Sequence, residues 1–437
     1  MTSASLGVRG LWALLGFRRF WIGEGVSFLG NEITELALPL TAVLVLGASA
    51  TEMGLLTAAL FLPYLVFGLV AGVWVDRMRR RPILVTLDLV SAAAVLAVPV
   101  AAWAGLLRME LLYVVAFVLG STVVVFMVAY QSFVPTLVGR EAIIEANAAL
   151  EATSSVALVA GPGLGGLLVQ LVGAPFALLV DGASFLFSAT LVGSIRIAEP
   201  PPIPRDKRAS VVEEVRAGIG YVASVPALAA LVRGGAVHNF FSRMMEALFV
   251  LFATRRLGLD AATIGLIVAA AGPGAFVGSL LASRTARVLG LGTTVWSMQV
   301  LTGIARLTVP ATLLLGPVAG TGNVATAAAV VLAAGMFLLG VARTVFNVNQ
   351  VSLRLSITPE RMHGRMNATM RFVMWGVTPF GALAGGFLAS TPLGLDATLV
   401  LAGLGVLAAT LFLLPEPLRN LTSLATPAGA GSSGVDE

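Results

Sequence analysis

The sequence has no cysteine, and it contains only two histidines and one lysine among 437 residues. Without cysteine, the chain cannot form disulfides, zinc–thiolate sites, iron–sulfur clusters or thiol nucleophiles. His238 and His363 are too far apart for a histidine-rich metal site, and Lys207 does not end a glycine-rich phosphate loop. We therefore expect no metal, no cofactor and no ATPase motif in this chain.

Charged residues are also scarce. They make up 11% of the chain, whereas hydrophobic residues make up 58% and the mean hydropathy is +0.96. Soluble domains carry about 25% charged residues. A chain with so few charges cannot cover a water-facing surface with polar groups, so its outer face must meet lipid.

Long apolar runs divide the chain into segments that can cross a membrane. A helix needs roughly 20 mostly apolar residues to span the hydrocarbon core. Twelve segments meet this requirement, which predicts an all-α integral membrane protein with twelve transmembrane helices. The predicted spans are Phe20–Leu46, Met53–Val75, Pro82–Trp103, Leu111–Val134, Ala152–Val172, Phe176–Ile195, Val225–Ala253, Thr263–Ala282, Thr294–Leu315, Val324–Val351, Met366–Ala389 and Leu395–Leu414.

The basic residues between these spans indicate the orientation of the chain. With a cytoplasmic N-terminus, nineteen arginines and lysines fall in inner segments, and only Arg108, Arg255 and Arg256 fall in outer loops. An excess of basic residues marks the cytoplasmic side of a membrane protein. We therefore place both termini in the cytoplasm. The same bias accounts for the isoelectric point of about 10.3 without a nucleic-acid partner.

The chain divides near its midpoint. We expect an N-terminal six-helix bundle over 1–195, a cytoplasmic linker over 196–224 and a C-terminal six-helix bundle over 225–415. The remaining residues, 416–437, form a cytoplasmic tail that is disordered at its end. The linker contains a proline-rich run, which cannot form a helix because proline lacks the amide proton.

Short motifs repeat between the two predicted bundles with a shift of 220 residues. Asn147-Ala148, Gly161 and Gly165-Gly166 recur as Asn367-Ala368, Gly381 and Gly385-Gly386. Pseudo-symmetric six-helix halves with corresponding glycine faces are typical of secondary transporters.

A glycine, an aspartate and several arginines follow the second predicted span. A carboxylate there can cap the N-terminus of another helix through its free amides and positive dipole. These residues form a candidate cytoplasmic gate, and the alternative is a basic anchor at the membrane surface. The candidate gate residues are Gly72, Asp76, Arg77, Arg80 and Arg81.

The fifth predicted span contains Gly161, Pro162, Gly165 and Gly166. Glycines let membrane helices approach closely, so the simpler interpretation is a packing face. The functional interpretation adds that Pro162 bends the helix and that the glycines seal one half of the protein against the other. A dinucleotide-binding fingerprint is excluded, because no strand precedes the motif and it lies within a membrane span.

These motifs resemble those of the major facilitator superfamily. The segment from Gly72 to Arg81 resembles the Gly-x-x-x-Asp-Arg-x-Gly-Arg-Arg signature, with Arg79 in place of the second glycine. The span 5 motif resembles the Gly-Pro-x-x-Gly-Gly signature of drug/proton antiporters. Further segments resemble the branch that includes enterobactin exporters and macrolide efflux proteins; these are Val134-Pro135 through Asn147-Ala148, Asp181-Gly182-Ala183-Ser184-Phe185-Leu186 and Gly364-Arg365-Met366-Asn367-Ala368.

The resemblance implies two six-helix bundles around a central cavity lined by spans 1, 4, 7 and 10. It also implies proton-driven export of small amphipathic molecules. Many proton-coupled members carry an arginine in span 4, and Leu111–Val134 has none. Proton coupling must therefore use other residues, or it is absent.

Two carboxylates in the first span are the strongest candidates for coupling. Ionisable groups inside a membrane span are functional candidates by default. Glu32 and Glu35 are three residues apart, so they lie on neighbouring parts of one helix face. Two nearby acids in a low dielectric resist joint ionisation, which suits a proton carrier or a cationic substrate site. The alternatives are an outer vestibule or permanent pairing with arginine.

Other polar residues in spans 1, 4, 7 and 10 are candidates for the wall of the cavity. Arg243 and Glu246 can form a structural ion pair across one helical turn. His238 can titrate near neutrality or be held by hydrogen bonds. The remaining groups can bind substrate or join helices. The complete set is Asn31, Tyr130, Gln131, His238, Asn239, Arg243, Glu246, Arg343, Asn347 and Gln350.

Taken together, these features predict a secondary exporter in the cytoplasmic membrane of a bacterium, working by proton antiport and alternating access. Its expected partners are the bilayer and a small drug- or siderophore-like molecule, and we expect it to function as a monomer. The alternatives are an importer or lipid flippase on the same fold, a channel, and a membrane-bound enzyme. No recognised catalytic constellation supports an enzyme.

Overall fold

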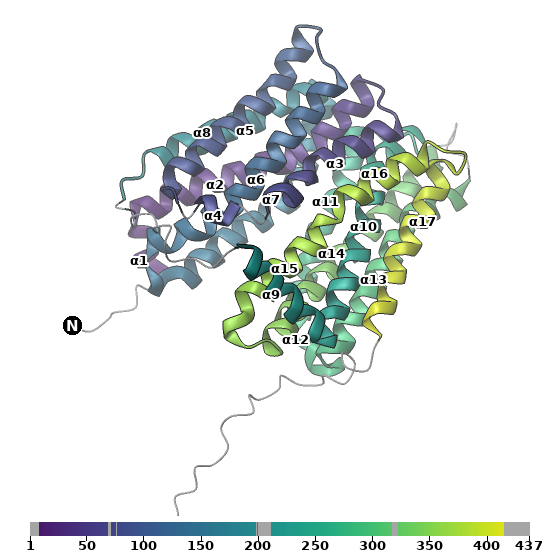
Figure 1. Ribbon diagram of the computed structural model, residues 1–437. Coiled ribbons are helices and arrows are strands. Elements are labelled where there is room, and N and C mark those ends of the chain that lie inside the picture. Colours follow the sequence, from purple (N-terminus) through teal and green to yellow (C-terminus); the bar gives the residue numbers. More distant parts are fainter. Residues whose placement is uncertain are drawn as a thin grey trace, which may run out of the picture.

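The computed structural model describes residues 8–68, 71–75, 77–197, 199, 211–316 and 322–414. Over these ranges the chain forms helices and short connections, with no strand. The helices gather into two bundles, one drawn in purple to blue and the other in green to yellow (Figure 1). The all-α membrane fold expected from the sequence is confirmed.

The first bundle contains the six predicted spans of the N-terminal half, together with two short helices. Its helices are α1 (Val8–Ala13), α2 (Leu15–Leu40, continued by a π turn at Thr41–Val45), α3 (Ala50–Phe67), α4 (Ala71–Val75), α5 (Arg80–Trp103), α6 (Met109–Val138), α7 (Ile143–Val172) and α8 (Ala174–Gly193).

The second bundle contains the other six predicted spans. Its helices are α10 (Pro226–Arg255), α11 (Ala261–Ala269), α12 (Ala271–Leu289), α13 (Leu291–Ala311), α14 (Gly322–Ser356), α15 (His363–Gly376), α16 (Thr378–Ala389) and α17 (Gly394–Ala408). The segments α11–α12 and α15–α16 each form one predicted span.

All twelve predicted spans correspond to helices. Within the described ranges, eleven helical segments are long and apolar enough to cross a membrane, and a twelfth is reached when α10 is joined with the helix before it. That preceding helix, α9 (Val211–Ser224), lies inside the predicted linker and meets α10 at a bend of 107°. The rest of the proline-rich run and the predicted tail lie outside the described residues, except for Glu199.

The break between α15 and α16 follows from a proline. Pro379 has no amide proton to donate to the carbonyl of Trp375, four residues earlier. The hydroxyl of Thr378 donates to that carbonyl instead, at 2.5 Å. The proline thus explains why the helix is interrupted at Val377, close to the cavity-lining Trp375.

The turns after the first and seventh spans have the same construction. Gly47 and Gly258 both adopt a positive φ, near 65° and 63°, which only glycine adopts without strain. Side-chain caps follow: Ser49 accepts a bond from the amide of Glu52, and Asp260 accepts one from Thr263. The paired turns lie 211 residues apart in sequence, so the repeat extends beyond the glycine motifs.

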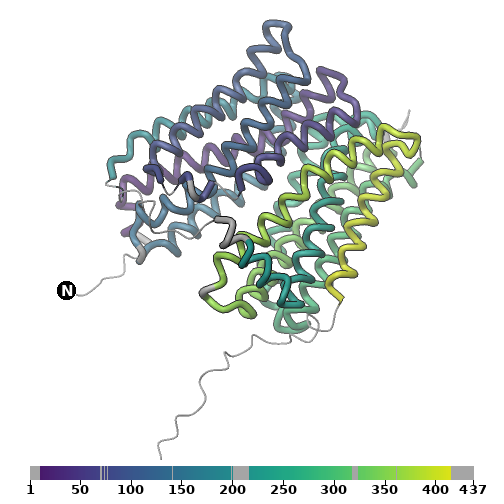
Figure 2. Tube along the Cα trace, in the orientation of Figure 1, coloured from purple at the N-terminus to yellow at the C-terminus, as the bar shows by residue number. Residues whose placement is uncertain are grey.

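Figure 2 shows the two bundles close together near α3, α11 and α16, and diverging toward α1 and α12. The loops after α2 and α10 lie at the converging end. The arrangement therefore has one sealed end and one divergent end.

Candidate functional site

A cavity of about 450 Å³ lies between the two bundles. Its walls come from α2, α3, α5, α6 and α8 of the first bundle, and from α10, α14 and α15 of the second. Spans 1, 4, 7 and 10 all contribute, as the resemblance implies, and spans 2, 3, 6 and 11 contribute as well. The second bundle is represented by three side chains, which are Arg243, Arg343 and Trp375.

One face of α2 supplies most of the polar lining. Glu24, Ser27, Asn31 and Glu35 follow one another at intervals of three or four residues, so they share a face of the helix. Of the two predicted coupling acids, only Glu35 lines the cavity. Glu32 does not belong to the lining.

Glu32 packs at the interface between α2 and α7. A Cβ atom placed on Gly161 would overlap the Cβ of Glu32, so the glycine makes room for this side chain. Glu32 still lies within electrostatic reach of Glu35 and of Arg343 across the cavity. Glu32 and Glu35 are thus neighbours, but Glu32 packs against α7 whereas Glu35 lines the cavity.

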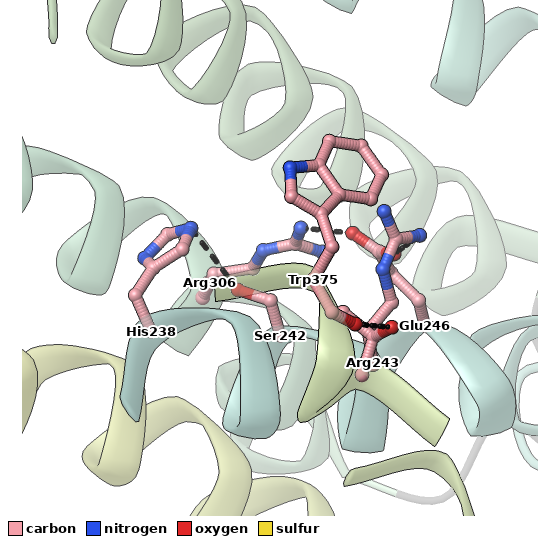
Figure 3. Close-up of polar contacts among 7 residues, drawn as sticks. His238, Ser242, Arg243, Glu246, Arg306 and Trp375 are labelled. Atoms are coloured by element: carbon pink, nitrogen blue, oxygen red, sulfur yellow. Dashed lines mark hydrogen bonds and ion pairs between the residues drawn. The ribbon is translucent and has the colours of Figure 1, made fainter. Parts of the chain in front are cut away.

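A three-residue ion cluster of Arg243, Glu246 and Arg306 lies on the second bundle's side of the cavity and lines it through Arg243 (Figure 3). Arg243 donates to one carboxylate oxygen of Glu246 at 2.5 Å, which confirms the pair predicted from their spacing. Arg306, on the neighbouring helix α13, binds the other oxygen. The carboxylate of Glu246 is thus shared by two guanidinium groups.

Arg243 also connects the ion cluster to an aromatic group that joins the bundles. Its guanidinium lies 4.0 Å from the ring centre of Phe61 on α3 and 6.0 Å from that of Trp375. Tyr64 stacks on Trp375 with ring centres 5.1 Å apart. Cation–π and stacking contacts of this kind hold a charge in place without neutralising it.

Glu35 faces the ion cluster from the first bundle. It is within electrostatic reach of Arg243, Glu246 and Arg343. Arg343 is exposed to the cavity and makes no ion pair at hydrogen-bonding distance among the described residues. Glu35 and Glu246 stand 211 residues apart, the same shift that relates the capped turns, so they occupy corresponding places in the two halves.

Several predicted cavity residues join helices instead. His238 contacts Gln299 of α13 at 2.9 Å and Ser242 at 3.4 Å, which makes it a hydrogen-bonded residue. The amide of Asn239 donates to the carbonyl of Met374 at 2.6 Å. Tyr130 packs on Phe20 with ring centres 5.6 Å apart.

Three other candidates also lie away from the lining. Gln131 and Asn347 are exposed outside it, and Gln350 is buried. Helical periodicity alone did not reveal which face of each span turns toward the cavity.

The sealed end depends on two glycine crossings with the same geometry. A Cβ on Gly54 of α3 would lie 2.7 Å from the carbonyl oxygen of Ala382 and 2.8 Å from the Cα of Gly386. A Cβ on Gly386 would lie 2.7 Å from the carbonyl oxygen of Ala50. Neither helix can approach so closely with any larger residue.

The second crossing joins α7 to α11. A Cβ on Gly166 would lie 2.9 Å from the Cα of Gly265 and would overlap the carbonyl oxygen of Ala261. The preceding residue, Gly165, points to a different neighbour and packs against Ile33 of α2. The glycines of the span 5 motif therefore contact both the first span and the other half.

The predicted cytoplasmic gate lies at the divergent end. Asp76 is outside the described residues, Gly72 lies in α4, and Arg77 is exposed. The backbone amides of Arg80 and Arg81 donate to the two carboxylate oxygens of Glu199, at 2.5 and 3.0 Å.

The side chain of Arg81 binds the carbonyls of Val192 and Gly193 at the end of α8. Glu199 thus caps the N-terminus of α5, a role that no sequence pattern indicated beyond an acid before a proline run. These contacts join the start of α5 to Glu199 and to the end of α8, and none of them involves the second bundle.

Two lining acids were not assigned to the cavity from the sequence. Glu24 lies on α2 and Asp88 on α5, and both are almost fully buried. Periodicity along α2 points to Glu24, since it shares a face with Asn31 and Glu35. Asp88 gave no such signal. Over the described ranges, no group of three histidine or acidic side chains is arranged to hold a metal ion.

Comparison with known proteins places this arrangement in context. The sequence profile of a family described as transmembrane secretion effector matches residues 12–430. The multidrug efflux pump Tap of Mycolicibacterium fortuitum is 28% identical over 394 residues, which cover 86% of this chain and 90% of that protein. Macrolide efflux protein A of Streptococcus pyogenes is 24% identical over 267 residues, or 61% of this chain and 66% of that protein.

Among solved structures, a bacterial homologue of the iron transporter ferroportin in an inward-facing state superposes with a TM-score of 0.70. The sequence identity is 16%, and the match covers 93% of this chain and 98% of that one. At this identity the similarity shows a shared fold.

Proposed function

The chain belongs to the transmembrane secretion effector family of the major facilitator superfamily, and from this premise we propose that it exports small amphipathic molecules by proton antiport with alternating access. The fold and the relatives are those of membrane transporters and not of enzymes. The cavity between the bundles would hold the substrate, which we expect to be drug-like or siderophore-like. We further propose a bacterial cytoplasmic membrane, cytoplasmic termini and a monomeric working unit.

The observation that carries this proposal is Glu35 facing Arg243 and Arg343 across a cavity that is sealed at one end. The predicted orientation makes the sealed end extracellular, because the loops after α2 and α10 lie there. The described conformation would then be inward-facing. The family relatives named as efflux pumps support export as the direction.

Glu35 is the residue we assign to proton coupling. Its carboxylate reaches the arginines only when the two bundles come together around the cavity, so its protonation is linked to their relative position. A charged Glu35 attracts Arg243 and Arg343, and a protonated Glu35 does not. Proton binding would therefore bias the equilibrium between the two cavity orientations.

The test is transport by purified protein in liposomes with an imposed pH gradient. Glu35→Gln retains the side-chain volume but cannot titrate, so we expect accumulation driven by the gradient to fall at least tenfold while downhill exchange continues. Glu32→Gln is the matched control, since Glu32 lies outside the cavity lining. We expect it to retain most of the accumulation.

Two results would contradict the proposal. Normal proton-driven accumulation by Glu35→Gln would remove this residue from the coupling mechanism. An absence of counter-flow with the wild-type protein, together with gradient-independent flux, would indicate a channel instead of a carrier.

A further inference from the structure

A buried carboxylate joins the first and sixth spans beside Glu35. Asp181 of α8 is fully buried, and its two oxygens accept hydrogen bonds from Thr34 of α2 at 2.5 Å and from Ser184 at 3.0 Å. Thr34 directly precedes Glu35 in the chain. Asp181 and Ser184 belong to the 181–186 segment that carries part of the family resemblance, and the proposed transport function leaves this segment without a role.

A glycine of α2 makes room for this carboxylate. A Cβ atom placed on Gly30 would overlap Oδ1 of Asp181 and Oγ of Ser184. Gly30 and Thr34 are one helical turn apart, so both face α8 and hold the carboxylate between them. The steric fit and the directed hydrogen bond together fix the rotation of α2 about its axis at this level.

The rotation of α2 decides which acid enters the cavity. Asn31 and Glu35 line the cavity and are exposed there, whereas Glu32 packs against α7. Within the described part of the chain, no side chain or amide forms a hydrogen bond or a close ion pair with the carboxylate of Glu35, which the arginines reach only electrostatically. The direction of Glu35 therefore follows from the rotation of the helix that carries it.

The corresponding contact in the second half is apolar. The shift of 211 residues relates Gly30 to Phe241 of α10, whose ring fills the space beside Gly405 of α17. In that half the acid that corresponds to Glu35, Glu246, is held directly by two arginines. An apolar contact is thus enough for packing at this place in the fold. A buried carboxylate is costlier than an apolar group, which points to a role of its directed bonds beyond packing.

We propose that Asp181 is a positioning residue for proton coupling: by binding Thr34, it holds α2 in the rotation that directs Glu35, and not Glu32, into the cavity. This proposal rests on the proposed function and adds to it the group that orients the coupling acid. Asp181 does not line the cavity, so it acts through α2 and not by contact with the substrate.

The rotation of α2 can be measured by labelling single cysteines with a hydrophilic maleimide, because the chain has no cysteine of its own. Asn31→Cys places the thiol in the cavity, and Glu32→Cys places it against α7. We expect the first thiol to react at least tenfold faster than the second. Adding Thr34→Val, which exchanges the hydroxyl for a methyl group of similar size, should reduce this ratio to less than threefold. Asp181→Ala should do the same.

Two further variants are the matched controls. Thr34→Ser keeps the donor hydroxyl, and Thr41→Val removes a hydroxyl from the same span that bonds the carbonyl of Ala37 within that span. Both should leave the labelling ratio within twofold of its original value. In liposomes, Thr34→Val and Asp181→Ala should also lose gradient-driven accumulation at least tenfold while downhill exchange continues, and Thr34→Ser should retain it.

An unchanged labelling ratio in Thr34→Val would overturn the proposal, even if thermal unfolding shows a less stable protein, because the cluster would then serve packing alone. An equal loss of the ratio in Thr34→Ser would overturn it as well, since the hydroxyl is preserved there. This comparison decides the matter alone if Asp181→Ala does not fold.

The proposed function can fail separately. If Glu35→Gln keeps its accumulation, the coupling assignment is wrong, while a changed labelling ratio still shows that Asp181 sets the rotation of α2. If Glu35→Gln loses accumulation but Thr34→Val keeps both its accumulation and its labelling ratio, the proposed function stands and the positioning role of Asp181 is refuted.

Discussion

At the scale of single residues, the site is governed by how charges are shared across the cavity. The carboxylate of Glu246 forms ion pairs with both Arg243 and Arg306. Its removal would therefore break both pairs. An unpaired guanidinium inside a membrane protein is strongly unfavourable. Removing the shared carboxylate is therefore expected to matter more than removing either arginine.

We predict that Glu246→Gln lowers stability more than Arg306→Gln does. The first change leaves two cations close together without their shared ion-pair partner, and the second leaves the Arg243–Glu246 pair intact. Removing one partner of a buried pair costs about 3–5 kcal/mol; one third of the Glu246 side chain is exposed, so we expect about 1–3 kcal/mol. Thermal unfolding in detergent measures the difference, and a larger loss for Arg306→Gln would refute the shared-carboxylate interpretation.

At the scale of helices, the glycine crossings determine how closely the bundles meet. The repeat of 220 residues relates Gly166 to Gly386, and a shift of 211 relates Gly54 to Gly265. Each glycine meets its partner from the other half, so the two crossings are built alike. Two helix backbones can make dispersion contacts at such short range only where neither carries a side chain, and any added atom pushes the helices apart.

We predict that Gly54→Ala opens the sealed end. Its Cβ would lie 2.7 Å from the carbonyl oxygen of Ala382, which the backbone can only relieve by moving. Overpacking costs about 1–3 kcal/mol, which corresponds to roughly a 5- to 150-fold shift in a two-state equilibrium. Because the chain has no cysteine, a Thr51→Cys/Ser390→Cys pair reports the closure through disulfide yield, since the native hydroxyls lie 2.7 Å apart.

Gly220→Ala is the control for this measurement. A Cβ at that position meets nothing within 4 Å, so the disulfide yield should match that of the parent pair. Undiminished yield in Gly54→Ala would show that α3 and α16 tolerate the extra methyl group, and that the crossing does not control closure.

At the scale of the whole molecule, the two bundles enclose the cavity between them. Each bundle has its own buried apolar residues, and their contacts with each other are concentrated near the glycine crossings and the aromatic group of Phe61, Tyr64 and Trp375. An exporter that alternates must separate the crossings in every cycle. The sealed end is therefore a point at which the whole cycle can be stopped.

We predict that oxidising the Thr51→Cys/Ser390→Cys pair abolishes transport and that a reducing agent restores it. The disulfide would hold α3 against α16 and prevent the sealed end from opening. Each single cysteine variant, treated with the same oxidant, should transport at the rate it shows before oxidation. Full transport by the cross-linked protein would mean that this end does not need to open.

The sequence alone determined the class of the protein and the course of the chain. Lipid contact demands long apolar runs with all backbone groups bonded internally, so composition and run length predicted all twelve spans. The repeat of Asn147-Ala148 and the glycines indicated two related halves. The ion pair of Arg243 and Glu246 was also predictable, because residues three apart on a helix are neighbours whatever surrounds them.

Only the tertiary structure decided which polar groups meet. Glu32 and Glu35 are equivalent in sequence, but the approach of α7 at Gly161 places one against a helix and leaves the other in the cavity. The Arg306–Glu246 ion pair and the cap that Glu199 provides for α5 join residues 60 or more apart in the chain. Periodicity carries no information on such contacts, because the rotation of each helix about its axis is set by packing against its neighbours.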